Sequence, residues 1–213
     1  MVEAVIWDFG GVLTSSPFEA FARYERERGL PVDFIRGINA TNPDTNAWAL
    51  FERSEVTLDE FDALFATEAK AKGHDLGGRA VVELLSGDIR PAVVAALKAC
   101  KARVKVGCIT NNVPAGQGAG MARSADKAAA VAEVMALFDH VIESSKLGIR
   151  KPDPRIYELA CKELGVSPAH CVYLDDLGIN LKPAKALGMT TIKVGDPAIA
   201  LQELEAAVGF PVG

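Results

Sequence analysis

The sequence predicts a doubly wound α/β fold, in which about five parallel strands form one sheet between two layers of helices. Short apolar runs alternate with helical patterns along most of the chain, as in parallel sheets built from strand–helix–strand units. The first run, residues 4–7, is apolar throughout, which is typical of a strand buried on both faces. Residues 15–89 show helical patterns only, and they therefore predict an all-helical insertion after the first strand.

The first strand and its turn contain the first candidate site residues. The apolar run ends at Asp8, and open α/β sheets bind their ligands at the carboxyl ends of parallel strands. Gly10 and Gly11 follow, and they allow a tight turn whose backbone amides can face an anion. A buried strand followed by an Asp-initiated turn would contain the same residues, so this stretch alone leaves both interpretations open.

Two capping patterns mark helices of the insertion. Ser16, a proline and Glu19 predict a helix that stops near Gly29. Thr57 and Glu60 form a second capping box ahead of an amphipathic helix. Shorter helical pieces are expected from residue 31 and over residues 47–53, with a turn at residues 42–44 between them. The expected core of the insertion consists of aromatic side chains at helical spacing: Phe18, Phe21, Trp48, Phe61 and Phe65.

After residue 89 the pattern changes to alternating strands and helices. The expected further strands cover residues 104–109, 140–143, 171–174 and 191–194. The expected helices cover residues 92–100, 126–137, 154–164, 179–187 and 197–208. We therefore expect an α/β core domain made of residues 1–14 and 90–213, and a helical cap made of residues 15–89.

Composition excludes several classes of protein. The net charge of −5 and the pI near 5.3 argue against a general nucleic-acid binder, because such binding depends on neutralising phosphates with Lys and Arg. No apolar stretch is long enough to predict a membrane span, and the chain begins in a strand without a basic-then-apolar leader. The four cysteines are far apart and form no CxxC pair, so we expect small buried thiols in a cytoplasmic protein.

Polar side chains follow four successive strands of the predicted sheet. They are Asp8 after the first, Thr110 and Asn111 after the second, Lys151 after the third, and Asp175 and Asp176 after the fourth. Since these strand ends open on the same edge of a parallel sheet, the groups can converge there. The residue types suit phosphoryl transfer: a carboxylate can attack phosphorus, Mg²⁺ prefers carboxylate and carbonyl oxygens, and a hydroxyl and an ammonium can stabilise the phosphoryl oxygens.

Each of these residues also has an interpretation without function. Asp175 and Asp176 could cap the next helix, Lys151 could be a solvated lysine before a proline, and Thr110 could be a hydroxyl at a strand end. These interpretations weaken together, because all four groups would have to fall at successive strand ends by accident.

In order and spacing, Asp8, Thr110, Lys151 and the pair Asp175–Asp176 resemble the four signatures of the haloacid dehalogenase superfamily. The resemblance covers nearly the whole chain, because the helical insertion looks like the cap of that family. Residues 138–139, 142–144, 151–152 and 173–185 are similar to the N-terminal phosphatase domain of soluble epoxide hydrolase.

The resemblance implies a Mg²⁺-dependent phosphatase of a small phosphate monoester. Asp8 would be nucleophile and metal ligand, Asp176 the second ligand, and Asp175 would bind the metal through water or steady the site. Gly10 can offer its main-chain carbonyl to the metal. Thr110, Asn111 and Lys151 would hold the phosphoryl group. The oligomeric state is open, although relatives with small caps often form homodimers.

Gly10 departs from the pattern of phosphatases in this superfamily, which usually have an Asp there that protonates the leaving oxygen. General acid–base help is typically worth about 10²–10⁴-fold in rate, so its loss would slow turnover without removing the nucleophile. Dehalogenases and phosphonate hydrolases of the superfamily also lack this Asp. The alternatives are therefore a non-phosphatase hydrolase of either kind, or a binding or regulatory module with little turnover.

One glycine-rich stretch, residues 113–125, suggests a nucleotide loop at first sight. It does not fit G-x-G-x-x-G and it follows the second strand instead of the first, so a mobile loop beside the site is the preferred interpretation. His74, His140 and His170 form no cluster in the sequence, and no role is assigned to them.

Overall fold

The computed structural model, which describes residues 1–118 and 120–213, contains one parallel sheet of five strands. The strands are β1 (Ala4–Trp7), β2 (Lys105–Thr110), β3 (His140–Glu143), β4 (Cys171–Asp175) and β5 (Thr190–Lys193). Their order across the sheet is β3-β2-β1-β4-β5, so the first strand lies in the centre. The predicted doubly wound α/β fold is confirmed.

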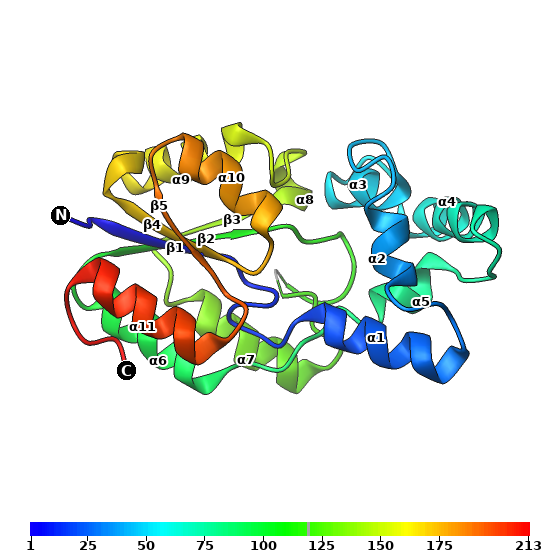
Figure 1. The fold of residues 1–213 in the computed structure, drawn as a ribbon, viewed down its shortest axis with the longest axis horizontal. Coiled ribbons are helices and arrows are strands. Elements are labelled where there is room, and N and C mark those ends of the chain that lie inside the picture. The colour runs from blue at the N-terminus through cyan, green and yellow to red at the C-terminus, as the bar shows by residue number, and fades with distance from the viewer. Residues whose placement is uncertain (119) are drawn as a thin grey trace.

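Both faces of the sheet are covered, which explains why the first strand is apolar throughout. Val5 and Trp7 pack with α6, α7 and α11 on one face, whereas Ala4 and Ile6 pack with α9 and α10 on the other. Figure 1 shows these two helical layers above and below the sheet. Since successive side chains of a strand point to opposite faces, four apolar residues in a row are what two cores require.

The helices of these layers have clear start and stop signals. Three of them begin with a proline in the first turn, and three end at a glycine with positive φ. The helices after the insertion are α6 (Pro91–Lys101), α7 (Ala125–Met135), α8 (Ser144–Leu147), α9 (Pro154–Leu164), α10 (Gly178–Ala186) and α11 (Pro197–Val208), with a 3₁₀ turn at Pro168–His170.

The inserted residues between β1 and β2 form their own helical cluster beside the carboxyl edge of the sheet (Figure 1). Phe21, Phe61 and Phe65 are buried in its apolar core, and Phe18 and Trp48 are partly buried against it. The helices are α1 (Pro17–Arg28), α2 (Phe34–Asn39), α3 (Ala47–Glu52), α4 (Leu58–Ala71) and α5 (Gly78–Val82).

Several predicted boundaries differ from the observed ones by one to three residues. The expected helical piece at residue 31 begins at Phe34, and the expected last strand at 191–194 is Thr190–Lys193. The short helices α5 and α8 were not predicted, because four or five residues are too few to show a helical period. The predicted capping boxes behave differently: Thr57 and Glu60 form both reciprocal bonds, whereas Ser16 caps the backbone of Phe18.

The chain enters and leaves the inserted helices at one place. Thr14 and Ile89 form an isolated antiparallel bridge. The Ser15 N–H donates to the carbonyl of Asp88 at 2.8 Å, and the Arg90 N–H donates to the carbonyl of Leu13 at 2.9 Å. The two connecting segments are thus hydrogen-bonded to each other, directly after the turn that follows β1.

The glycine-rich loop after β2 packs on the inserted helices. Val113 is buried in their apolar core, and Ala115 and Met121 pack against it. Gln117 and Ala122 form an isolated antiparallel bridge, so these two residues lie side by side. Ala119, which belongs to the stretch 113–125 considered above, lies outside the described residues.

Two further observations concern the whole described chain. Cys100, Cys108, Cys161 and Cys171 are free and buried, as expected for small apolar side chains. None of the described helices is long and apolar enough to cross a lipid bilayer.

Candidate active site

Asp8 follows directly after β1, at the carboxyl edge of the sheet, and its side chain is held on one side only. The Phe9 N–H donates to Asp8 Oδ1 at 2.7 Å, and Lys151 Nζ lies 2.7 Å from the same oxygen. No donor among the described residues contacts Oδ2. The carboxylate is therefore fixed through one oxygen while the other is free to act as a ligand or nucleophile.

Lys151 is buried between two carboxylates. Its ammonium lies 2.7 Å from Asp8 Oδ1 and 2.8 Å from Asp175 Oδ2, and only 1% of the side chain is exposed. Burial by itself lowers the pKa of this ammonium, but Asp175 and Asp8 more than offset it, so the pKa lies above its usual value. Lys151 therefore stays charged at any pH at which the protein works.

Asp175 accepts hydrogen bonds from four residues. Lys151 and the Tyr173 hydroxyl bind Oδ2 at 2.8 and 2.5 Å, the Leu177 N–H binds Oδ1 at 2.8 Å, and Asn180 Nδ2 lies 3.1 Å from both oxygens. These donors use the lone pairs of a fully buried carboxylate. Asp175 is consequently placed to orient Lys151.

Asp176 follows directly after β4, and its side chain lies against the turn after β1. A Cβ on Gly11 would be 2.3 Å from Asp176 Oδ2, and Gly11 has φ +81°, so only glycine fits at this point. Ser16 Oγ lies 3.5 Å from the same oxygen. Burial, followed by the charge of Asp175, raises the pKa of Asp176 to about 6.

The three carboxylates form a cluster whose negative charge suits a divalent cation. One oxygen of each of Asp8, Asp175 and Asp176 lies within 4.8 Å of the others. Burial raises the pKa of Asp8 well above its usual value, Asp175 and Asp176 raise it further, and Lys151 only partly opposes this. One ammonium does not compensate three neighbouring carboxylates, and hard oxygen ligands are those that Mg²⁺ prefers. The residues present therefore fit this ion.

Gly10 adds an open position to the same edge. A Cβ placed on Gly10 would meet no heavy atom within 4 Å, and its φ lies outside the left-handed region. Nothing in the described fold requires glycine here, in contrast to Gly11. Its carbonyl accepts no hydrogen bond from the described backbone, so it is available to a ligand.

Thr110 and Asn111 follow at the end of β2. Thr110 is buried, and its hydroxyl makes no hydrogen bond within the described part of the chain. The side-chain amide of Asn111 binds the backbone of Lys151 twice: Oδ1 accepts from the N–H at 2.8 Å, and Nδ2 donates to the carbonyl at 3.0 Å. The predicted contact of Asn111 with the phosphoryl group stays a prediction, and the observed contact of its side chain is with the backbone of Lys151.

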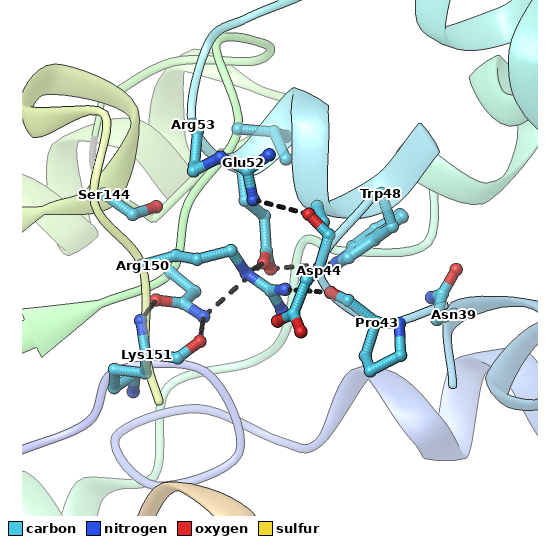
Figure 2. A network of polar contacts seen from close by, with 12 residues as sticks. Asn39, Pro43, Asp44, Trp48, Glu52, Arg53, Ser144, Arg150 and Lys151 are labelled. Carbon is cyan, nitrogen blue, oxygen red and sulfur yellow. Dashed lines mark hydrogen bonds and ion pairs between the residues drawn. The ribbon is translucent and has the colours of Figure 1, made fainter. Parts of the chain in front are cut away.

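Sequence reasoning did not identify four residues that contact this site. Tyr173 precedes Asp175 by two positions on the same strand, and this spacing puts both side chains on one face. Asn180 lies one helical turn beyond the aspartates, and its amide donates to Asp175. Glu52 and Arg150 form an ion pair, 2.5 Å long, which Figure 2 shows, and no local pattern indicates this pair. The side-chain amide of Asn111 lies 3.5 Å from Glu52.

The arrangement can perform nucleophilic displacement on an anionic group. Asp8 supplies a carboxylate oxygen, Lys151 a fixed positive charge, and Thr110 a free hydroxyl at the neighbouring strand end. Groups that are fixed before the reaction stabilise developing charge without reorganisation. The carboxylate cluster can hold a cation that neutralises an incoming oxyanion.

Comparisons with known proteins bear on the family and on the fold. Residues 2–188 match the profile of the haloacid dehalogenase-like hydrolases. Acyl-CoA dehydrogenase family member 10 of Mus musculus is 34% identical over 98% of this chain and 19% of its own length. Bifunctional epoxide hydrolase 2 of the same species is 32% identical over 96% of this chain and 39% of its own length. This chain thus spans less than half of either relative.

Two further proteins match over most of their own length. Phosphatase MT3486 of Mycobacterium tuberculosis is 32% identical over 88% of this chain and 85% of its own length. A solved HAD family enzyme of Bacteroides thetaiotaomicron, in complex with magnesium and inorganic phosphate, superposes with a TM-score of 0.60. It is 19% identical, and the match covers 92% of this chain and 96% of that enzyme, which demonstrates a shared fold.

Proposed function

This chain belongs to the haloacid dehalogenase-like hydrolase family, and from that premise we propose that it hydrolyses a small phosphate monoester with the help of Mg²⁺. The reaction would pass through an aspartyl-phosphate on Asp8. The observation that carries this proposal is the ammonium of Lys151, which is fixed between Asp8 and Asp175 beside a third carboxylate at the sheet edge. A phosphoryl group bound there would meet a nucleophile and a positive charge together.

In the first step, the free Oδ2 of Asp8 attacks phosphorus and the bond to the ester oxygen breaks. The ester oxygen leaves with the bonding electron pair and takes up a proton, so the products are an alcohol and an aspartyl-phosphate. Lys151 and the hydroxyl of Thr110 bind the non-bridging phosphoryl oxygens, whose charge changes in the transition state.

In the second step, water attacks phosphorus and releases inorganic phosphate, which regenerates the carboxylate of Asp8. Mg²⁺ would be held by Asp8, Asp176 and the carbonyl of Gly10, and when bound it would neutralise charge on the phosphoryl oxygens. We assign Asp175 a positioning role, because its lone pairs are used by Lys151, Tyr173, Leu177 and Asn180.

Asn111 also acts as a positioning residue in this scheme. Its amide holds the backbone of Lys151 through two hydrogen bonds, so it sets where the ammonium lies without contacting the substrate through its side chain. Such indirect positioning matters because small displacements of a catalytic group lower the rate strongly.

A similar sequence and the carboxylate cluster support the phosphatase assignment over the dehalogenase and phosphonate hydrolase alternatives. Phosphatase MT3486 is similar over 88% of this chain and 85% of its own length. The carboxylates of the cluster are hard oxygen ligands of the kind that Mg²⁺ prefers, which supports a metal-dependent reaction.

We further propose that residues 15–89 are a cap over this site and that residues 1–14 and 90–213 are the catalytic core. Two features support the division: the inserted helices have their own apolar core, and the chain enters and leaves them through adjacent hydrogen-bonded segments. A cap close to the carboxyl edge suits a small-molecule substrate that it can enclose.

Asp8→Asn tests the proposal directly. Phosphate release from an aryl phosphate should require Mg²⁺ in the wild-type protein and should fall by roughly 10⁴-fold or more in Asp8→Asn, because an amide does not attack phosphorus. Circular dichroism and the melting temperature show whether the variant is folded. Equal activity of the two proteins would overturn the proposal.

Gly10→Asp tests whether a general acid is missing. Since position 10 has open space, an Asp there should be accepted without strain. Turnover of alkyl phosphates should rise more than turnover of aryl phosphates, because a poor leaving group needs the proton more. Equal changes for both substrate types would contradict the interpretation of Gly10 as a missing acid.

A second candidate function is a binding module that keeps the site but turns over little. Gly10 is the observation that favours it, since no side chain at that position can move a proton. Beryllofluoride with Mg²⁺ mimics the phosphorylated carboxylate and should bind to an enzyme at Asp8. Lack of binding, together with no hydrolysis over a broad phosphate panel, would favour the module.

A further inference from the structure

Glu52 at the end of α3 is a buried carboxylate from the inserted helices that contacts the core. Its Oε2 lies 2.5 Å from Arg150 Nε, a close ion pair in which the N–H is not well aligned for a hydrogen bond. Trp48 Nε1 donates to Oε1 at 2.9 Å, and Asn111 Nδ2 lies 3.5 Å from Oε2, at the long end of hydrogen bonding. Figure 2 shows Trp48, Glu52 and Arg150 converging between α3 and the segment that leads to Lys151.

The Glu52 partners lie directly beside the ammonium that the proposed chemistry needs. Arg150 precedes Lys151 in the chain, and Asn111 holds the Lys151 backbone through its N–H and its carbonyl. The carboxylate of Glu52 therefore contacts both residues that fix the position of Lys151. It forms an ion pair with Arg150 and lies within reach of the side-chain amide of Asn111. The ammonium itself points the other way, to Asp8 and Asp175.

Further contacts attach the same end of α3 to the core. Arg150 also donates from Nη1 to the carbonyl of Pro43 at 2.8 Å. The hydroxyl of Ser54 donates to the carbonyl of Ser145 at 2.7 Å. The segment on either side of α3 is thus bound to the stretch between β3 and Lys151, so movement of the inserted helices would pull on that stretch.

We propose that Glu52 is a positioning residue through which docking of the inserted helices aligns Lys151 for phosphoryl transfer. This rests on the proposed phosphatase function and extends it to a residue outside the family signatures. A substrate that allows α3 to dock would be turned over with Lys151 in place, and one that holds α3 away would meet a less well placed ammonium. Glu52 would thereby contribute to substrate choice without contacting the reacting atoms.

Glu52→Gln removes the charge but keeps the shape and an acceptor for Trp48. Glu55→Gln is the matched control, because Glu55 pairs with Arg53 at 2.6 Å in the same region, is half exposed, and has no recorded contact with Asn111 or Lys151. We expect Glu52→Gln to lower kcat by roughly 10- to 100-fold with KM changed less than threefold, as expected for a misplaced catalytic group (~1 Å). Glu55→Gln should behave as wild type.

If Glu52 had a structural role only, Glu52→Gln would lower the melting temperature and leave kcat of the folded protein unchanged. If Glu52→Gln proves unstable, Arg150→Lys provides the same test, because it keeps the charge but cannot contact both Glu52 and Pro43. Equal kcat for Glu52→Gln, Arg150→Lys and Glu55→Gln, in an active wild type, would overturn this inference alone. A wild type that is as inactive as Asp8→Asn would overturn the proposed function and this inference with it.

Discussion

Arg150 and Lys151 are neighbours in the chain, but they belong to two different ion-pair clusters. Lys151 joins the ends of two central strands through Asp8 and Asp175, and its side chain is 1% exposed. Arg150 joins the core to α3 through Glu52, and its side chain is 19% exposed. The Lys151 cluster lies at the edge of the sheet. The Arg150 cluster lies at the contact with the inserted helices, as Figure 2 shows.

The two clusters differ in the number of carboxylates that surround each cation. Lys151 lies in a surplus of carboxylates, since Asp176 adds a third one nearby, so this cluster favours a further cation. Arg150 meets one carboxylate and one carbonyl, so its single positive charge is balanced by the charge of Glu52. The first cluster is suited to bind and react, whereas the charge balance of the second suits it to dock one part of the chain on another.

Replacing Lys151 should have the largest effect. Lys151→Met leaves Asp8 and Asp175 buried without their ammonium, which we expect to cost about 3–5 kcal/mol of unfolding free energy. Loss of its charge at the phosphoryl group should lower kcat by roughly 10²–10³-fold. Chemical denaturation and aryl phosphate assays measure both effects. Lys146→Met is the control, because the Lys146 side chain is 74% exposed; unchanged activity in Lys151→Met would contradict the assigned role.

Without Mg²⁺, the melting temperature should depend on pH through the carboxylates around Lys151 and not through the cluster around Arg150. Burial and Asp175 raise the pKa of Asp176 to about 6 from its usual 3.8. A carboxyl group that binds its proton more tightly when folded stabilises the fold at low pH, and this contribution is lost as the pH rises through about 6. In EDTA, the melting temperature should therefore fall as the pH rises from about 4 to about 6.

Saturating Mg²⁺ should raise the melting temperature most at neutral pH, because the cation binds the ionised carboxylates of the folded state. Asp176→Asn should flatten the pH dependence in EDTA and weaken the effect of Mg²⁺. Glu52→Gln should change neither slope, because Glu52 belongs to the other cluster. A magnesium effect that persists unchanged in Asp176→Asn would show that the ion binds elsewhere.

A smaller effect is expected at Trp48, the aromatic member of the docking cluster that it forms with Glu52 and Arg150. Trp48→Phe keeps a ring near Phe61, which it meets edge-on at 5.7 Å, but removes the donor to Glu52. Loss of this hydrogen bond should cost about 1 kcal/mol of unfolding free energy and lower kcat less than Glu52→Gln does. In a Glu52→Gln background the effect on kcat should shrink, because coupled residues are not additive. Full additivity would contradict the proposed connection.

The smallest effect should come from the exposed ion pair of Arg53 and Glu55, which lies next to the docking cluster. Glu55→Gln breaks the ion pair with Arg53, whose partner carboxylate is 48% exposed. Solvent and salt screen such pairs, so we expect less than about 0.5 kcal/mol of lost stability. The difference should vanish at high salt, as urea unfolding at two ionic strengths would show. A larger loss than in Trp48→Phe would contradict the division between buried docking and exposed pairing.

The sequence was sufficient to predict the fold class and the place of the candidate site. A strand buried on both faces must be apolar at every position, and an acid directly after it lies at the sheet edge, so residues 4–7 and Asp8 were informative together. The strand order was not predicted, because nothing local determines which parallel strands become neighbours. Gly10 and Gly11 look alike in the sequence, and only the position of Asp176 distinguishes them.

The docking cluster could not be predicted from the sequence for a related reason. Glu52 ends a short helix and Arg150 lies in a loop, about 100 residues apart, so no periodicity links them. Asn111 was correctly placed at a strand end, but its partner depends on the path of the chain around Lys151. Contacts of this kind depend on the packing of whole segments, which a pattern along the chain does not contain.

The bridge between Thr14 and Ile89 has a consequence for the architecture of such enzymes. Because the outgoing and returning segments are hydrogen-bonded at one junction, the inserted helices leave and rejoin the core at a single point. A different insertion could be joined there without rethreading the sheet. It would also have to replace the contacts that α3 makes with Arg150 and the packing of Val113, because these reach the neighbourhood of Lys151.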